Sequence, residues 1–143
     1  MSQTITIYIS ADTLKLKQLF PDGGDITDHT IIVMTDSNDS PVYESIFRDK
    51  LITSAQSDDA IKWVISSGTE RVSVSFTEFR ADQNASKVFI NTPTKNPSNP
   101  SEFDAQIKSG IKGEIDTEYF LSFCINSDER IVWTWDPMIK VRY

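Results

Sequence analysis

The sequence is poor in the residue types that carry most enzyme and metal chemistry. Its 143 residues include one cysteine, one histidine and five glycines. The single cysteine, Cys124, has no partner for an intrachain disulfide, and one Cys with one His falls short of the nitrogen and sulfur ligands that a zinc site needs. The glycines form no phosphate-binding loop. We therefore expect a protein that is not an enzyme and holds no cofactor or metal.

Basic charge and long apolar runs are scarce as well. Fourteen Lys and Arg stand against 21 Asp and Glu, a formal net charge of −7, so the chain lacks the basic field that attracts nucleic acid or anionic lipid. No apolar stretch approaches the roughly 20 residues that span a bilayer. Residues 1–7 have neither the basic nor the apolar part of a secretory signal. We expect no nucleic-acid partner, no membrane partner and a cytoplasmic location.

Alternation of apolar and polar residues, the pattern of β-strands, is what the sequence has in abundance. Residues 4–10 place Ile5, Ile7 and Ile9 on one face, and residues 60–66 and 71–76 alternate around a turn, which predicts a hairpin. About seven to eight such strands predict one all-β domain over residues 1–143, an antiparallel β-sandwich with immunoglobulin-like or jelly-roll-like connections. A barrel fits the same pattern.

Shorter signals mark the segments between these strands. Asp12 or Thr13 is placed to cap a short helical turn before Pro21. Residues 87–90 read as a short strand. Residues 91–101 follow as the longest loop, because three prolines and three asparagines disfavour both ladder and helix.

Three tryptophans carry the main binding hypothesis. Trp63, Trp133 and Trp135 fall on the apolar phase of their strands, which favours core packing. The alternative is an exposed aromatic platform for a sugar or other small ligand, formed by Trp63, Trp133 and Tyr143 beside the loop of residues 91–100.

Candidate chemistry outside the tryptophans is sparse. His29 lies in a polar loop and reads as a surface histidine, whereas Cys124 lies in an apolar strand and reads as core. The loop carboxylates Asp22, Asp25 and Asp28 have the oxygen chemistry that calcium prefers, and they fit equally well as solvated turn residues. Whether the loop aspartates bind calcium stays open at this point.

Both ends of the chain carry a family resemblance. The run Trp133-Thr134-Trp135-Asp136-Pro137-Met138-Ile139-Lys140-Val141, with residues 5–13 followed by Phe20-Pro21, resembles the AidA/PixA family of bacterial inclusion body proteins, which includes the autoinducer-dependent AidA and the phase-variable PixA. Residues 59–63 and 119–123 are similar to the family's mid-chain and penultimate strands. The chain is shorter than the family leads us to expect, and residues 21–25 replace its usual loop after the first strand. The resemblance implies a cytoplasmic β-sandwich that acts in stationary-phase or density-dependent physiology, with no established biochemical activity.

The shared C-terminal motif reads as structural. Pro137 cannot donate to a ladder and holds Asp136 in extended geometry, so Trp135-Asp136-Pro137 is predicted to break the final strand, with Asp136 binding nearby backbone amides at the corner. Our main hypothesis is a non-enzymatic protein that self-associates, as a homodimer, through an edge supplied by the first and last strands. The alternative is the small-ligand or carbohydrate-binding module described above.

Overall fold

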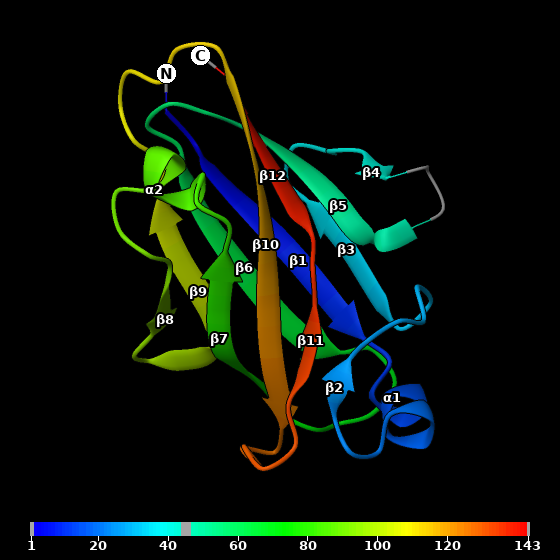
Figure 1. Ribbon diagram of the computed structural model, residues 1–143. Helices are drawn as coiled ribbons and strands as arrows, with labels where there is room; N and C mark the ends of the chain where they lie inside the picture. The colour runs from blue at the N-terminus through cyan, green and yellow to red at the C-terminus, as the bar shows by residue number, and fades with distance from the viewer. Residues whose placement is uncertain (1, 44–46, 143) are drawn as a thin grey trace.

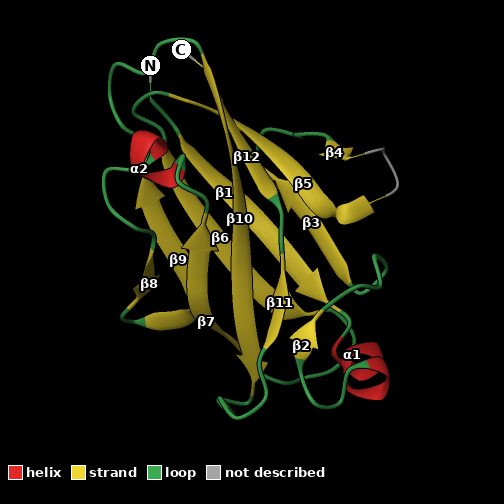
Figure 2. Cartoon of the chain, in the orientation of Figure 1, coloured by secondary structure: helices red, strands yellow, loops and turns green. Residues whose placement is uncertain are grey.

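A computed structural model describes residues 2–43 and 47–142. They form two β-sheets packed face to face, with a short helix near each end of the sandwich (Figures 1 and 2). The all-β sandwich class predicted from the alternation is confirmed. In the part of the chain described, no helix is long and apolar enough to cross a membrane.

The smaller sheet has five strands in the order β3-β1-β6-β9-β8. These strands are β1 (Thr4–Ala11), β3 (Ile32–Asp36), β6 (Ala60–Ser67), β8 (Thr94–Asn96) and β9 (Asn99–Gln106). Figure 1 shows this sheet behind the other one. Its strands β1 and β6 contribute the inward-facing side chains Ile5, Ile7, Ile9 and Trp63, each no more than 2% exposed, which confirms the predicted inward face of the first strand.

The larger sheet follows the order β2-β11-β10-β12-β5-β4, and β7 pairs with β10 off this path. Its strands are β2 (Gly24–Asp25), β4 (Val42–Tyr43), β5 (Phe47–Gln56), β7 (Val74–Ala81), β10 (Glu114–Ile125), β11 (Trp133–Trp135) and β12 (Met138–Arg142). The long strand β10 is the centre of this sheet, because β7, β11 and β12 all pair with it.

The sheets are mixed, which corrects the purely antiparallel prediction. Strand β1 runs parallel to β6, β12 parallel to β5, and β11 parallel to β2. Alternation reports which face of a strand is buried but not its direction, so the sequence pattern did not contain this information. The mixed order also places β1 between β3 and β6, and β12 between β10 and β5. The first and last strands are therefore interior strands and do not supply the free edge that we expected.

The predicted hairpin of residues 60–66 and 71–76 is wrong, although both strands exist. Strand β6 lies in the five-stranded sheet and β7 in the seven-stranded sheet, so the connection crosses from one layer to the other. Thr13 anchors this connection by hydrogen bonds to Ser67 at 2.8 Å and Glu70 at 2.6 Å. Gly68 passes so close to β1 that a Cβ there would lie 2.4 Å from Ser10 Oγ, so a larger residue would require the Ser10 side chain to move.

Residues 85–101 also differ from the prediction. The predicted strand at 87–90 is replaced by the helical turn α2 (Ala85–Val88), where the Phe89 amide donates to the Ala85 carbonyl at 2.9 Å. The predicted loop contains β8 and the start of β9, which pair with each other. Pro100 sits near the first residue of β9, a strand position that proline tolerates. The other helix, α1 (Thr13–Leu19), confirms the predicted turn: Asp12 caps it by accepting from the Lys15 amide at 3.0 Å.

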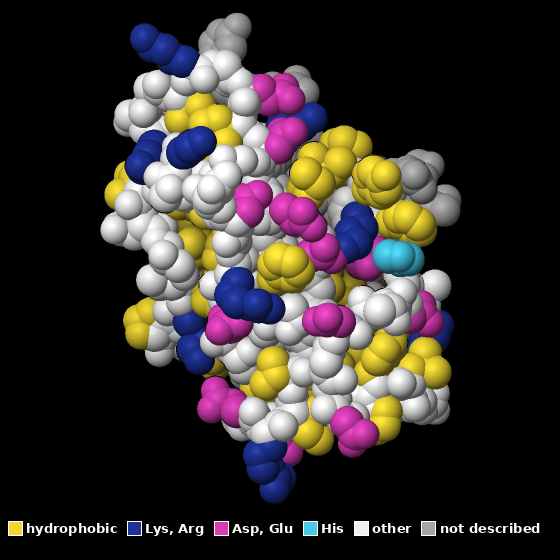
Figure 3. Space-filling view, viewed as in Figure 1, with side chains coloured by type: hydrophobic (Ala, Val, Ile, Leu, Met, Phe, Trp, Pro, Cys, Tyr) yellow, Lys and Arg dark blue, Asp and Glu magenta, His cyan; other side chains and the backbone are white. Residues whose placement is uncertain are grey.

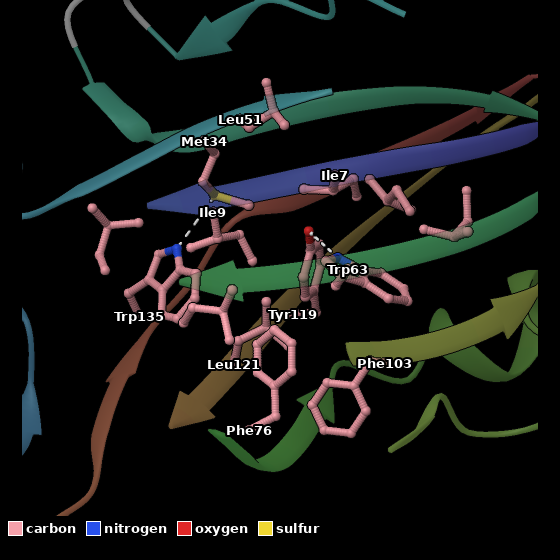
Figure 4. Packing of buried hydrophobic residues seen from close by; sticks show 14 of the residues in the cluster. Ile7, Ile9, Met34, Leu51, Trp63, Phe76, Phe103, Tyr119, Leu121 and Trp135 are labelled. Carbon is pink, nitrogen blue, oxygen red and sulfur yellow. Dashed lines mark hydrogen bonds between the residues drawn. The ribbon is translucent and has the colours of Figure 1, made fainter. Parts of the chain in front are cut away.

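The core lies between the sheets and is rich in aromatic rings. Figure 4 shows Trp63 and Phe103 from the smaller sheet facing Phe76, Tyr119, Leu121 and Trp135 from the larger one. Trp63 donates from Nε1 to the Tyr119 hydroxyl at 3.0 Å, and both side chains are 0% exposed. This hydrogen bond joins β6 to β10 and therefore links the two layers directly.

Candidate functional site

The Trp135-Asp136-Pro137 motif interrupts the last strand, as the sequence predicts. Strand β11 ends at Trp135 and β12 begins at Met138, and both pair with β10 on either side of the break. The Pro137 carbonyl accepts from the Tyr119 amide of β10 at 3.1 Å. The motif thus fixes where the chain passes from β11, beside β2, to β12, beside β5.

Asp136 binds a side chain rather than the backbone amides that we predicted. Its carboxylate accepts a hydrogen bond from Lys50 of β5, and Lys50 Nζ also donates to the Asp136 carbonyl at 3.2 Å. The Glu118 carboxyl lies on the other side of Asp136. Its pKa is raised above the ordinary value, first by the hydrogen bond to Asp136, then by partial burial and by the Asp136 charge. Two carboxyls and one ammonium group therefore share the surface at this corner.

His29 and Asp49 form a second polar pair beside this corner. His29 Nδ1 lies 2.9 Å and 3.2 Å from the two Asp49 carboxylate oxygens, and Asp49 is 1% exposed. The imidazole stacks on Phe47, with ring centroids 4.1 Å apart. His29 therefore lies at the surface, as predicted, with its side chain 39% exposed, and the sequence did not indicate that Asp49 and Phe47 hold it in place.

A sequence signal for this pair existed and was missed. Asp49 occupies an inward phase of β5, shared with Leu51, Thr53 and Ala55. A carboxylate at an inward position needs a hydrogen-bond donor, and the one histidine of the chain was the natural candidate. The spacing did not indicate which loop would bring it there.

These side chains border a shallow pocket of about 270 Å³ at the junction of β2, β5 and β11. Asp25, His29, Lys50, Phe120 and Asp136 contribute to its lining. Figure 3 shows acidic side chains gathered over β10 and β12, with the single histidine at the border of this region. Within residues 2–43 and 47–142, no group of three or more His, Cys, Asp or Glu side chains is arranged to hold a metal ion.

The tryptophans lie in the core, which removes the predicted aromatic platform. Trp63 and Trp133 are 0% and 3% exposed, and Trp133 Nε1 donates to the Phe20 carbonyl at 2.8 Å. Trp135, at 2%, directs its Nε1 to the Met34 sulfur at 3.3 Å (Figure 4). Tyr143, the third residue of the predicted platform, lies outside the described residues. Trp63 is enclosed in the core, whereas Trp133 contributes to the lining of a pocket of about 360 Å³ beside Pro21 and Ile131.

The segment that follows α2 separates two open grooves. One, of about 620 Å³, lies between β7 and this segment, and its apolar lining includes Phe79, Ala81 and Phe89. The other, of about 780 Å³, is lined mainly by residues of β6 and β9 in the five-stranded sheet. Ile90, Asn91 and Thr92 border both grooves, and Ile90 is 54% exposed. Part of the predicted ligand-binding loop therefore does line a concave surface.

Sequence comparison does not place this chain: no family model matches it, and no curated protein is similar to it at a significant level. Structural comparison shows a similar fold. An inclusion body protein of the PixA type from Burkholderia cenocepacia J2315 superposes with a TM-score of 0.69 at 16% identity, over 99% of this chain and 96% of the other.

Two multicopper oxidases also align. One is Fet3p, which functions in iron import, at a TM-score of 0.37 and 12% identity, over 96% of this chain and 27% of the oxidase. The second oxidase aligns at a TM-score of 0.32 and 11% identity, over 96% of this chain and 44% of the oxidase. Scores this low do not indicate a shared fold. The chain therefore has the fold of the PixA-type inclusion body protein, the fold that the resemblance in its sequence implies.

Proposed function

We propose that this chain is a non-enzymatic member of the bacterial inclusion body protein family and acts in the cytoplasm by self-association. The observation that carries the proposal is the structural match to the Burkholderia inclusion body protein, which extends over nearly the full length of both chains.

The charge of the protein makes a specific interface necessary. At a net charge of −7, copies repel one another at long range, so association needs local complementarity that outweighs this repulsion. Non-specific apolar coalescence is a poor alternative, because the exposed large apolar side chains are distributed over α1, β1, β4 and the segment after α2. Self-association through a defined surface, as a homodimer or a larger assembly, is the form that the proposal takes.

Light scattering behind size exclusion tests the proposal. The protein is measured over a wide range of loading concentrations, with calcium and with a chelator. We expect the mass to rise from that of the monomer toward that of the dimer as concentration increases. A monomer at every concentration contradicts the proposal. A calcium-dependent mass or melting temperature assigns a role to the loop aspartates, because a ligand that binds only the folded state stabilises it.

A small-ligand module is the second candidate, supported by the two grooves that meet at Asn91 and Thr92. In these grooves, side-chain amide and hydroxyl groups on apolar walls would contact the ligand. Melting temperatures in the presence of mono- and oligosaccharides test this candidate, with a concentration-dependent rise expected. Tryptophan emission is not expected to respond, since Trp63 and Trp133 are buried. If no sugar raises the melting temperature, the carbohydrate-binding version of this candidate is refuted.

A further inference from the structure

Strand β7 has an outer edge that the rest of the chain covers only in part. Its other edge pairs with β10 from Val74 to Ala81, with a register shift that leaves Thr77 without a partner residue in β10. On the outer edge, the Val74 carbonyl accepts from Ser101 Oγ at 2.5 Å and the Phe76 carbonyl accepts from Lys95 Nζ at 3.5 Å. Both donors come from the hairpin of β8 and β9, and they cover the first part of the strand.

The remaining part of β7, residues 77–81, has no strand beside its outer edge among the described residues. We call this stretch the open edge. It faces the groove of about 620 Å³, with the half-buried Phe79 and Ala81 in the groove wall and the exposed Ile90 across from them. An unpaired edge presents backbone N–H and C=O groups as a template for a further strand.

Two other candidate edges, those of β5 and β8, are covered or shorter. The outer side of β5 is occupied by the segment before it, where the Ile52 amide donates to the Pro41 carbonyl at 2.9 Å and the Ser54 amide donates to Ser40 Oγ at 3.1 Å. Strand β8, at the end of the smaller sheet, has three residues and is followed directly by Pro97. The open edge of β7 is therefore better suited to strand addition than the edges of β5 and β8.

The charges of this edge suit a second copy of the same strand. Glu78 and Arg80 lie on the outward face of β7, with side chains 56% and 59% exposed, and within one chain they already form an ion pair, with Arg80 Nε 2.8 Å from Glu78 Oε1. The Arg80 guanidinium also lies over the Phe120 ring, 5.3 Å from its centroid. Two identical strands that pair antiparallel are related by a two-fold axis. When this axis passes through Phe79, Glu78 of one copy stands opposite Arg80 of the other, and the reverse pair forms on the other side of the axis. Opposite charges in cross-strand positions stabilise a strand pair.

On this basis we propose that the protein dimerises by antiparallel pairing of the open edge of β7 with the same edge of a second copy. The inference rests on the proposed self-association and names the surface that performs it. The two larger sheets become one continuous sheet across the dimer, and Phe79 meets its symmetry mate on the inner face. On the outer face, Glu78 and Arg80 add two cross-strand ion pairs to the pair that they form within each chain. Such an interface is short, so its dimer is expected to be concentration-dependent rather than permanent.

A charge-swap experiment tests the interface. Glu78→Arg places basic side chains opposite each other at both cross-strand positions, and Arg80→Glu places acidic ones there. Each variant alone is expected to dimerise about 30-fold more weakly than the wild type, because two attractive pairs become two repulsive ones. A mixture of the two variants restores opposite charges at both positions, so heterodimers are expected with wild-type affinity. Sedimentation velocity with one variant fluorescently labelled measures them.

Matched controls come from the other sheet. Glu102→Lys and Lys62→Glu change the net charge by the same amounts and also alter a surface ion pair, at 3.8 Å on β6 and β9. They are expected to leave dimerisation unchanged. Melting temperatures show whether each variant is folded. Formation of heterodimers in the mixture is itself evidence that both variants are folded, because a misfolded variant does not pair.

The outcomes separate the interface from the proposed function. A wild type that dimerises, single variants that do not and a mixture that does support the β7 pairing. A wild type that dimerises together with Glu78→Arg and Arg80→Glu variants that dimerise equally well overturns the β7 interface but leaves self-association standing. A wild type that remains monomeric overturns both.

Discussion

Replacing Tyr119 with Phe tests whether the two sheets are joined as described. The substitution removes the hydroxyl that accepts from Trp63 Nε1 at 3.0 Å, and both side chains are 0% exposed. Because the indole N–H then has no partner in the core, Tyr119→Phe is expected to cost about 2 kcal/mol of unfolding free energy. Burial raises the pKa of Tyr119 well above its ordinary value, so the hydroxyl stays neutral and the cost is independent of pH near neutrality.

Urea unfolding followed by tryptophan fluorescence measures this cost. With a denaturant slope of about 2 kcal/mol per molar, the unfolding midpoint is expected to fall by about 1 M. Tyr8→Phe and Tyr43→Phe are the matched controls, because their side chains are 53% and 50% exposed. They are expected to change stability by less than about 0.5 kcal/mol. Equal midpoints for Tyr119→Phe and the two controls refute the inter-sheet hydrogen bond.

Three further substitutions test the polar corner and α1. Glu118→Gln removes a carboxyl whose pKa Asp136 raises above its ordinary value of 4.5. Because the folded protein holds this proton more tightly than the unfolded chain does, the wild type loses stability as the pH rises from 4.5 through the raised pKa. The stability of the variant relative to the wild type, measured by urea titration, is therefore expected to increase from about pH 4 to about pH 7. Equal differences at both values contradict the carboxyl contact. His29→Leu leaves the buried Asp49 carboxylate without its described donor, at a cost of about 3 kcal/mol, and adding Asp49→Asn is expected to recover part of it; an unchanged melting temperature in His29→Leu argues against the pair. Asp12→Ala removes the cap of α1 and is expected to cost about 1 kcal/mol in thermal or urea unfolding, whereas Asp12→Asn retains most of it.

Local rules predicted much of the fold. The alternation at Ile5, Ile7 and Ile9 identified the inward face of β1, and the Asp12 cap and the break at Pro137 follow from side-chain and backbone chemistry that acts over a few residues. Which strands pair with each other does not follow from such local rules. The apolar phases of β6 and β7 are correct, but alternation does not say whether the connection between them turns within one sheet or crosses to the other. In the fold it crosses, and Thr13 of α1, which is distant in sequence, forms hydrogen bonds with it.

The candidate site was harder to predict for the same reason. Asp49 and Lys50 come from β5, His29 from the loop before β3, and Asp136 from the break between β11 and β12. Only the parallel pairing of β5 with β12 brings these segments together, and alternation does not report strand direction. The open edge of β7 likewise becomes visible only when the partners of every strand are known.

Hydrogen exchange of the wild-type protein at low and high concentration tests the central claim, self-association through β7, most directly. Amides of a free strand edge exchange faster than amides in a paired ladder. Residues 77–81 are expected to exchange more slowly at the concentration where light scattering reports a dimer, while the interior strands β1 and β12 exchange equally at both concentrations. Exchange at residues 77–81 that stays the same in monomer and dimer contradicts the claim.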